Sequence, residues 1–228
     1  MKVLSFDTSH PRRTVIELLW ETQSLELALD IESSQQDKLL YSIHHLLSTI
    51  GGSLDMLDAI VVGKGPGSFT GLRIGISLAK GFAWAASLPL YPISSLEALA
   101  FSFPWEIQPH ATVIASIDAR MKKLYTTIYH AKTQVLPESD LSPEELAHHI
   151  ATQPAPYYFV GDLLYREIFT TILGEKSCIF LQQWIKPSLL RQRALLQRPL
   201  SHDELLSFEP LYLRKSEAEN QKITKNAQ

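Results

Sequence analysis

Apolar residues divide the first half of the chain into a regular series of elements. Strict alternation from Leu25 to Ile31 predicts a half-buried strand, and the apolar spacing after Ser34 predicts a helix that ends at Gly51-Gly52. The expected order is strand, strand, strand, helix, strand, helix, strand, over residues 3–6, 14–19, 25–31, 34–50, 58–63, 68–86 and 89–93. The first half is therefore predicted to be an α/β unit.

The second half of the chain repeats this order. Strands are predicted over residues 112–118, 123–130, 133–136, 157–161 and 178–181, and helices over residues 142–151, 162–173 and 187–197. An aspartate ends the first strand of each half, Asp7 and Asp118. Two β-β-β-α-β-α units in tandem predict an α/β protein with the duplicated ribonuclease-H-like fold of the actin, hexokinase and Hsp70 ATPases.

Composition suggests where the two units separate. The aromatic and proline-rich stretch 101–109 is the expected junction, so we predict an N-terminal subdomain over residues 1–103 and a reduced C-terminal subdomain over 104–214. Residues 215–228 are polar and are predicted to be a disordered tail.

Charge and length set further bounds. The 228 residues carry a net charge of −3, which gives no positive footprint for nucleic acid over the whole surface. If RNA is involved, we expect another subunit to supply most of the positive charge. The longest apolar stretch contains Arg73 and Lys80, so no membrane span is predicted, and the single Cys178 fits a reducing cytoplasm.

Six of the ten glycines lie between Gly63 and Gly81, and the first three form a turn after a predicted strand. Such a turn can cradle phosphate with backbone N–H groups, yet its spacing matches neither of the common phosphate-binding motifs. A structural turn and a phosphate cradle both remain open, and Asp7 is equally consistent with a simple turn residue. The residues that a cofactor would use are Asp7, Thr8, Ser9, Gly65, Gly67 and Ser68.

The helix predicted over 68–86 carries small residues at every fourth position, namely Gly71, Gly75, Ala79 and Ala83. Each helical glycine costs roughly 1 kcal/mol relative to alanine, so a packing reason is expected. The stripe either packs on the sheet of its own domain or lets a helix of a second subunit approach closely. We favour the subunit interface.

Catalytic and metal-binding patterns are not found. The pairs His44-His45 and His148-His149 are adjacent in sequence, so their side chains diverge on a helix and do not chelate together. No Gly-x-Ser-x-Gly element occurs. We therefore predict no metal, no cofactor and no catalytic residue, and leave open whether Asp118 and Arg120 pair with each other.

Five motifs, over residues 4–9, 62–75, 94–99, 117–121 and 210–214, together resemble the TsaB (YeaZ) family. The matches run in order along nearly the whole chain, and the glycine block is the most specific of them. The chain departs from the usual family pattern at Gln35 and at Lys122, so no family contact is carried over to these two residues.

The resemblance implies a non-catalytic, cytoplasmic subunit of the machinery that makes N6-threonylcarbamoyladenosine on tRNAs reading codons that begin with A. It implies that the N-terminal helices pair with the related catalytic subunit TsaD, that the ATPase TsaE docks on this pair, and that TsaC makes the threonylcarbamoyl adenylate. It also implies self-pairing when TsaD is missing, and tRNA contact only within the complex.

Together, the helix pattern and the resemblance place the partner interface on two helices. The expected interface residues are Leu39, Ile43, Leu46, Leu47, Gly71, Leu72, Gly75, Ile76, Ala79 and Ala83. The main alternative is an independent ATP-dependent small-molecule kinase of the same fold. A glycoprotease-like metallopeptidase, suggested by older family labels, is a more distant one.

Overall fold

The computed structural model describes residues 1–30 and 35–214, with the backbone alone at residues 35–37. The tail expected over 215–228 lies outside the described residues.

The expected elements of the first half are confirmed, with ends that differ by one or two residues. They are β1 (Lys2–Asp7), β2 (Arg13–Trp20), β3 (Gln23–Asp30), α1 (Gln35–Thr49), β4 (Ala59–Gly63), α2 (Phe69–Ala85) and β5 (Leu90–Ile93), with a short 3-10 turn, η1 (Leu54–Met56), before β4. A further helix, α3 (Ser95–Phe101), was not expected. It begins at Ser94, whose side chain accepts a hydrogen bond from the backbone N–H of Glu97.

The second half also follows the expected order. Its elements are β6 (Thr112–Asp118), β7 (Leu124–His130), β8 (Thr133–Leu141), α4 (Pro143–Ala151), β9 (Tyr157–Gly161), α5 (Arg166–Leu173), η2 (Glu175–Ser177), β10 (Cys178–Leu181), α6 (Pro187–Ala194) and α7 (His202–Ser207). Strand β8 is longer than expected, and α7 was not expected. Helix α5 begins four residues later than expected, directly after Tyr165, which has a left-handed backbone conformation. In the segment before it, the carboxylate of Asp162 bonds to His10 and to the backbone N–H of Asp118.

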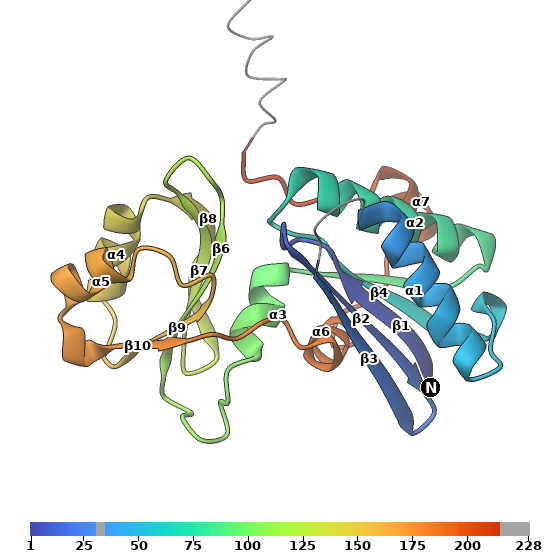
Figure 1. The fold of residues 1–228 in the computed structure, drawn as a ribbon, viewed down its shortest axis with the longest axis horizontal. Coiled ribbons are helices and arrows are strands. Elements are labelled where there is room, and N and C mark those ends of the chain that lie inside the picture. The colour runs from blue at the N-terminus through green and yellow to red at the C-terminus, as the bar shows by residue number, and fades with distance from the viewer. Residues whose placement is uncertain (31–34, 215–228) are drawn as a thin grey trace, which may run out of the picture.

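The two halves contain sheets of identical topology (Figure 1). The strand order is β3-β2-β1-β4-β5 in the first and β8-β7-β6-β9-β10 in the second. In each sheet the first three strands are antiparallel and the last two run parallel to the first. This arrangement confirms the duplicated ribonuclease-H-like α/β fold.

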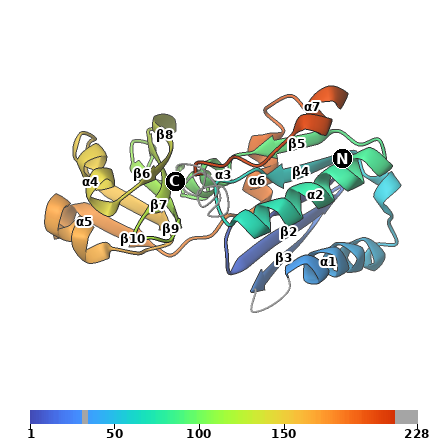
Figure 2. The ribbon, with the colours of Figure 1, turned by 90° about the horizontal axis from the view of Figure 1, so that it is seen from above.

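Successive residues of the central strands face opposite sides of their sheet and so belong to different layers of the apolar core, of which the described residues form three. In β1, Leu4 packs toward α1 and α2, whereas its neighbour Val3 belongs to the core between the two sheets. In β6, Val113 faces this same central core, and Ile114 packs toward α4 and α5. Helices α1 and α2 therefore cover one outer face of the molecule, and α4 and α5 cover the other (Figures 1 and 2).

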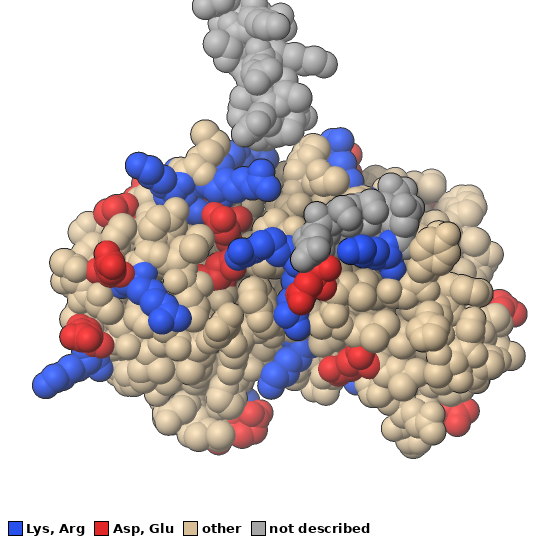
Figure 3. Space-filling view, in the orientation of Figure 1, with Lys and Arg blue, Asp and Glu red and all other residues tan. Residues whose placement is uncertain are grey.

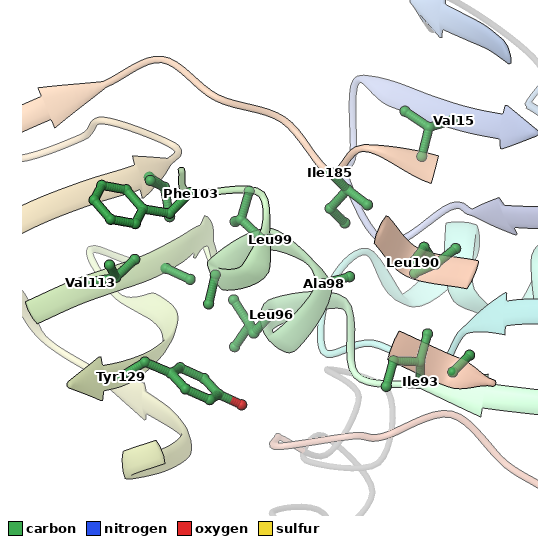
Figure 4. Packing of buried hydrophobic residues seen from close by; sticks show 14 of the residues in the cluster. Val15, Ile93, Leu96, Ala98, Leu99, Phe103, Val113, Tyr129, Ile185 and Leu190 are labelled. Carbon is green, nitrogen blue, oxygen red and sulfur yellow. The ribbon is translucent and has the colours of Figure 1, made fainter. Parts of the chain in front are cut away.

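The two halves exchange a helix across the central core. Helix α3, from the first half, packs on β6 and β7, and helix α6, from the second half, packs on β1, β2, β4 and β5. The close-up shows Leu96 and Leu99 of α3 beside Val113, and Leu190 of α6 beside Ile93 (Figure 4). The cores of the two halves are thus one continuous apolar layer.

Ion pairs hold the exchanged helices in place. Glu17 on β2 is fully buried, and both of its carboxylate oxygens accept hydrogen bonds of 3.0 Å from the guanidinium of Arg191 on α6. Arg193 of α6 bonds to Glu97 of α3 at 2.6 Å. Helix α6 therefore packs on the first half, and the division into subdomains 1–103 and 104–214 stays a prediction.

The chain after α6 continues along α2. The backbone N–H of Leu200 bonds to the carbonyl of Leu90 at 2.9 Å, and that of Leu211 bonds to the carbonyl of Lys64 at 2.7 Å. Between these points, α7 lies beside α2 (Figure 2), with Trp84 against His202 at 4.9 Å between ring centroids. One side of α2 is therefore covered by the chain itself.

Candidate functional site: a sealed strand-end loop and an exposed helix pair

Asp7, at the end of β1, is enclosed by hydroxyl groups. Its side chain is 1% exposed; Oδ1 accepts bonds from the backbone N–H and the hydroxyl of Ser9, at 2.8 and 2.5 Å, and Oδ2 accepts a bond from Ser95 at 2.5 Å. Burial raises the pKa of Asp7, and the bonds from the two serines oppose this only in part. Both carboxylate oxygens are used inside the protein.

The glycine turn after β4 closes over this carboxylate. A Cβ on Gly63 would fall on the carboxylate of Asp7, and a Cβ on Gly67 would fall on the backbone oxygen of Ser9. Gly65 has φ +96° and donates its N–H to Ser95, while the N–H of Ser68 donates to Ser9 at 2.6 Å. These glycines are needed for close backbone approach.

The six residues named as cofactor candidates are thus brought together, but their polar groups bond mainly to one another or to nearby backbone. Thr8 donates to the carbonyl of Gly71 at 2.8 Å, and Ser68 caps α2 by accepting the N–H of Gly71 at 3.3 Å. The contacts favour a structural turn over a phosphate cradle.

A contact between the halves lies directly beside this loop. His10 Nε2 is 3.2 Å from Asp162 Oδ1, and the rings of His10 and Trp184 form a T-shaped contact with 4.7 Å between centroids. Burial acts to raise the pKa of Asp162, but the bonds from His10 and from the N–H of Asp118 hold that pKa below its usual value. A small pocket lined by His10, Asp162 and Trp184 measures about 20 Å³, which is room for about one water molecule.

The small-residue stripe of α2 faces this loop and not a second subunit. Gly71, Gly75, Ala79 and Ala83 are all buried, and a Cβ on Gly75 would fall on the hydroxyl of Thr8. The expectation that the stripe gives clearance to a partner helix is therefore wrong. The stripe packs on the molecule's own first loop and sheet, the alternative that the sequence left open.

The other expected interface residues are buried too. They are Leu39, Ile43, Leu46 and Leu47 of α1, and Leu72 and Ile76 of α2, with exposed fractions of 7% or less. The reason is the helical period of 3.6, because the most apolar face of a surface helix packs on the sheet. A partner would meet the opposite face.

That opposite face is defined by exposed side chains of α1 and α2. On α1, Leu40 is 50% and Tyr41 is 74% exposed, and on α2 Trp84 is 55% exposed. Ser77 and Gly81 are exposed one turn apart, and a Cβ on Gly81 would meet nothing within 4 Å. We call these five residues the outer helix face. The sequence pattern did not reveal it, because the most apolar stripe of each helix lies on the other side.

Comparison with known proteins identifies the family. A family model described as "TsaD: tRNA N6-adenosine threonylcarbamoyltransferase" matches residues 32–155. TsaB, the "tRNA threonylcarbamoyladenosine biosynthesis protein" of Bacillus subtilis (strain 168), is 31% identical over 230 residues, covering 96% of each chain. TsaB of Haemophilus influenzae is 30% identical over 94% of each chain. The chain belongs to the TsaB family. It is thus a member of a family named for tRNA threonylcarbamoyladenosine biosynthesis.

A solved structure of the TsaB (YeaZ) family has the same fold. YeaZ from Pseudomonas aeruginosa superimposes with a TM-score of 0.75 at 26% identity, covering 92% of this chain and all of that one. A second structure, described as similar to peptidase YEAZ from the same organism, also has a TM-score of 0.75, at 28% identity. This chain, with its paired sheets and exchanged helices, therefore has relatives of known structure in the TsaB family.

Within residues 1–30 and 35–214, no group of three or more His, Cys, Asp or Glu is placed to hold a metal ion. No helix in that part of the chain is long and apolar enough to span a membrane. Asp118 and Arg120, whose relation was open, are joined through the backbone, because the N–H of Arg120 donates to Asp118 Oδ1 at 2.8 Å.

Proposed function

We propose that this chain is a non-catalytic accessory subunit required to form N6-threonylcarbamoyladenosine at position 37 of tRNAs that read codons beginning with A. Membership of the TsaB family supports the pathway. The sealed Asp7 loop supports the accessory role, because the position where ATPases of this fold bind phosphate is filled by Ser9, Ser95 and the glycine turn.

The partner is the catalytic subunit TsaD, bound through the outer helix face. The observation that carries this assignment is the match of the TsaD model to residues 32–155, a stretch that includes both α1 and α2. A related chain with the same helix pair can meet this one face to face about a pseudo-twofold axis. The outer helix face then joins two like surfaces.

Chemistry of the outer helix face fits such a contact. Trp84 and Tyr41 are large, amphipathic and mostly exposed, which is typical of residues that anchor an interface. Ser77 and Gly81 are small and leave room for a facing helix to approach the backbone of α2. By the same argument, a second copy of this chain occupies the face when TsaD is absent.

The remaining partners depend on this pairing. TsaE is recruited to the pair formed by this chain and TsaD, and TsaC supplies the threonylcarbamoyl adenylate without a lasting contact. This chain contributes the docking surface, and TsaD contributes the reacting groups.

Two glycine substitutions on one helix test the proposal. Gly81→Gln adds an exposed side chain to the outer helix face, so we expect the chain to fold and its affinity for TsaD to fall more than about tenfold. Gly75→Gln places a side chain on Thr8 and is expected to prevent folding. Co-purification with TsaD and circular dichroism distinguish the two effects.

Reconstituted tRNA threonylcarbamoylation, with TsaD, TsaE and TsaC, completes the test. Product formation is expected to require the wild-type chain and to fall with Gly81→Gln in proportion to TsaD binding. Modification at full rate without the chain would refute the accessory role. Saturable binding of ATP and magnesium by the isolated chain, measured by calorimetry, would favour the kinase alternative.

A further inference from the structure

Basic side chains gather where the second half meets the end of α2. In the space-filling view, Lys and Arg lie along the upper edge of the molecule, over the place of the β6–β7 turn in Figure 1 (Figure 3). The turn itself, between β6 and β7, exposes Arg120 and Lys122 on either side of Met121. All three residues have positive φ, of 58°, 51° and 59°.

Arg214 connects this turn to a groove beside α2. Its guanidinium contacts the carbonyl of Ala119 and the sulfur of Met121, each at 3.4 Å, and it is paired with Asp140 at 2.8 Å. The groove encloses about 610 Å³ between α2 and residues 208–214. The turn and the groove therefore form one continuous surface.

Cations and aromatic rings line the groove together. The guanidinium of Arg73 lies 3.9 Å from the ring centre of Phe69, and its Nε donates to the hydroxyl of Tyr212 at 3.2 Å. The rings of Phe69 and Tyr212 are 5.0 Å apart between centroids. Single-stranded RNA is bound in this way, with phosphates on cations and bases against aromatic or guanidinium planes.

The charge balance of this surface is opposite to that of the chain. Within the described residues, Arg73, Lys80, Arg120 and Lys122 form no ion pair, and Arg214 is compensated by Asp140. Glu209 is the acidic residue that lines the groove. A chain of net charge −3 thus presents a local excess of positive charge.

We infer that this surface, the basic turn (Arg120, Lys122) with the Arg73 groove, binds the phosphate backbone of the RNA substrate. The inference rests on the proposed function, and it refines the expectation that another subunit supplies most of the positive charge. Because phosphate contacts position a nucleic acid without reading its sequence, the surface orients the tRNA beside the partner's active site.

The test compares two pairs of lysine or arginine substitutions in the complex with TsaD. Arg120→Asn with Lys122→Asn removes two charges from the basic turn, and asparagine tolerates positive φ. The control, Lys132→Asn with Lys176→Asn, removes two exposed charges elsewhere; Lys132, in the β7–β8 turn, also has positive φ, of 65°. Thermal unfolding checks that both double variants are folded.

The probe is an unmodified transcript of a tRNA that reads a codon beginning with A, titrated at several salt concentrations. The double variant of the basic turn is expected to bind about tenfold more weakly and to lower the salt slope of binding by about one per residue. The control pair is expected to match wild type. Arg73→Gln is expected to weaken binding further.

The inference would be overturned if both double variants weakened tRNA binding equally, or if neither of them weakened it. Loss of TsaD from the complex with unchanged tRNA affinity would also overturn it, and would make the surface a protein interface. Failure of the proposed function is a separate outcome, seen when modification proceeds without the chain, whereas the difference in tRNA affinity between the two pairs judges this surface alone.

Discussion

The loops after β1 and β6 occupy the same position in the two halves, yet one is sealed and the other is open. In the first loop, the residues from Asp7 to His10 are at most 7% exposed. In the second loop, Arg120, Met121 and Lys122 are exposed and adopt left-handed backbone conformations. Duplication has therefore given the chain two copies of one position with opposite surroundings.

The difference arises from the residues that come directly after the next parallel strand. At the end of β4 and in the turn that follows it, the glycines at 63, 65 and 67 let the backbone pack directly on the first loop. In the second half, Gly161 ends β9 and is followed by Asp162 and by three larger residues before α5 begins at Arg166. No glycine turn is present to cover the second loop. The equivalent positions after β1 and β6 are therefore a packed joint in one half and an exposed surface in the other.

The largest effect on stability is expected from a methyl group added to the glycine turn that packs on the first loop. In Gly63→Ala the new Cβ falls on the carboxylate of Asp7, which must move and lose its bonds from Ser9 and Ser95. We expect a loss of about 3 kcal/mol or more in the free energy of unfolding, measured in urea.

The matched control is Gly81→Ala, on the exposed face of α2. Its Cβ meets nothing within 4 Å, so the substitution is expected to stabilise the helix by up to about 1 kcal/mol. Wild-type stability of Gly63→Ala would show that Asp7 has room to relocate, and would contradict a sealed loop.

The sequence predicted the elements of this comparison better than their surroundings. Periodicity and strand-end aspartates predicted both sheets and both loops, because these signals are local. Helices α3 and α7 were missed although Ser94 and Ser201 each precede a glutamate by three residues, a recognisable helix start. Helix exchange was not predictable, since the two halves carry the same local pattern.

The candidate site was predicted only in part for a similar reason. Four-residue spacing predicted the stripe through Gly71 and Gly75, but spacing does not say which neighbour the stripe meets. The neighbour is Thr8, 63 residues away from Gly71 in the chain, and only the folded structure brings them together. Likewise, no local signal links His10 to Asp162.

The acid range offers a second test of the two halves, because the pKa values of Asp7, after β1, and Asp162, after β9, are shifted in opposite directions. The pKa of Asp7 is raised above 3.8 by burial. Stability from this group is therefore present below pH 3.8 and is lost as pH rises through the folded pKa. The pKa of Asp162 is lowered below 3.8 by His10 and the N–H of Asp118, against the effect of burial. The stabilisation from Asp162 is present above pH 3.8 and is lost as pH falls through the pKa that Asp162 has in the folded chain.

Two isosteric variants, Asp7→Asn and Asp162→Asn, are expected to show opposite changes of stability with pH. At neutral pH, Asp162→Asn is expected to lose about 2 kcal/mol, because a buried bond to a charged partner is removed. Relative to wild type, Asp7→Asn should gain stability as pH rises, and Asp162→Asn should lose it. Urea unfolding from about pH 2 to about pH 7 spans both windows and measures both trends. Parallel trends would contradict the opposite environments.

The smallest expected effect comes from replacing one loop residue with glycine. This substitution is expected to change the free energy of unfolding in opposite directions in the two loops. Arg120→Gly relieves a left-handed conformation that costs a non-glycine residue about 1 kcal/mol, and the added freedom of the unfolded chain offsets part of this gain. We expect a net stabilisation of about 0.5 kcal/mol.

Ser9→Gly, in the sealed loop, removes a hydroxyl bond to Asp7 and is expected to destabilise the chain by about 1 kcal/mol. Urea midpoints at neutral pH compare the two variants directly. If Arg120→Gly also destabilised the chain, the second loop would be held by contacts of its own. An exposed surface loop tolerates glycine, and a packed loop does not. Opposite changes in stability for Arg120→Gly and Ser9→Gly would therefore show that the second loop is open and the first is packed.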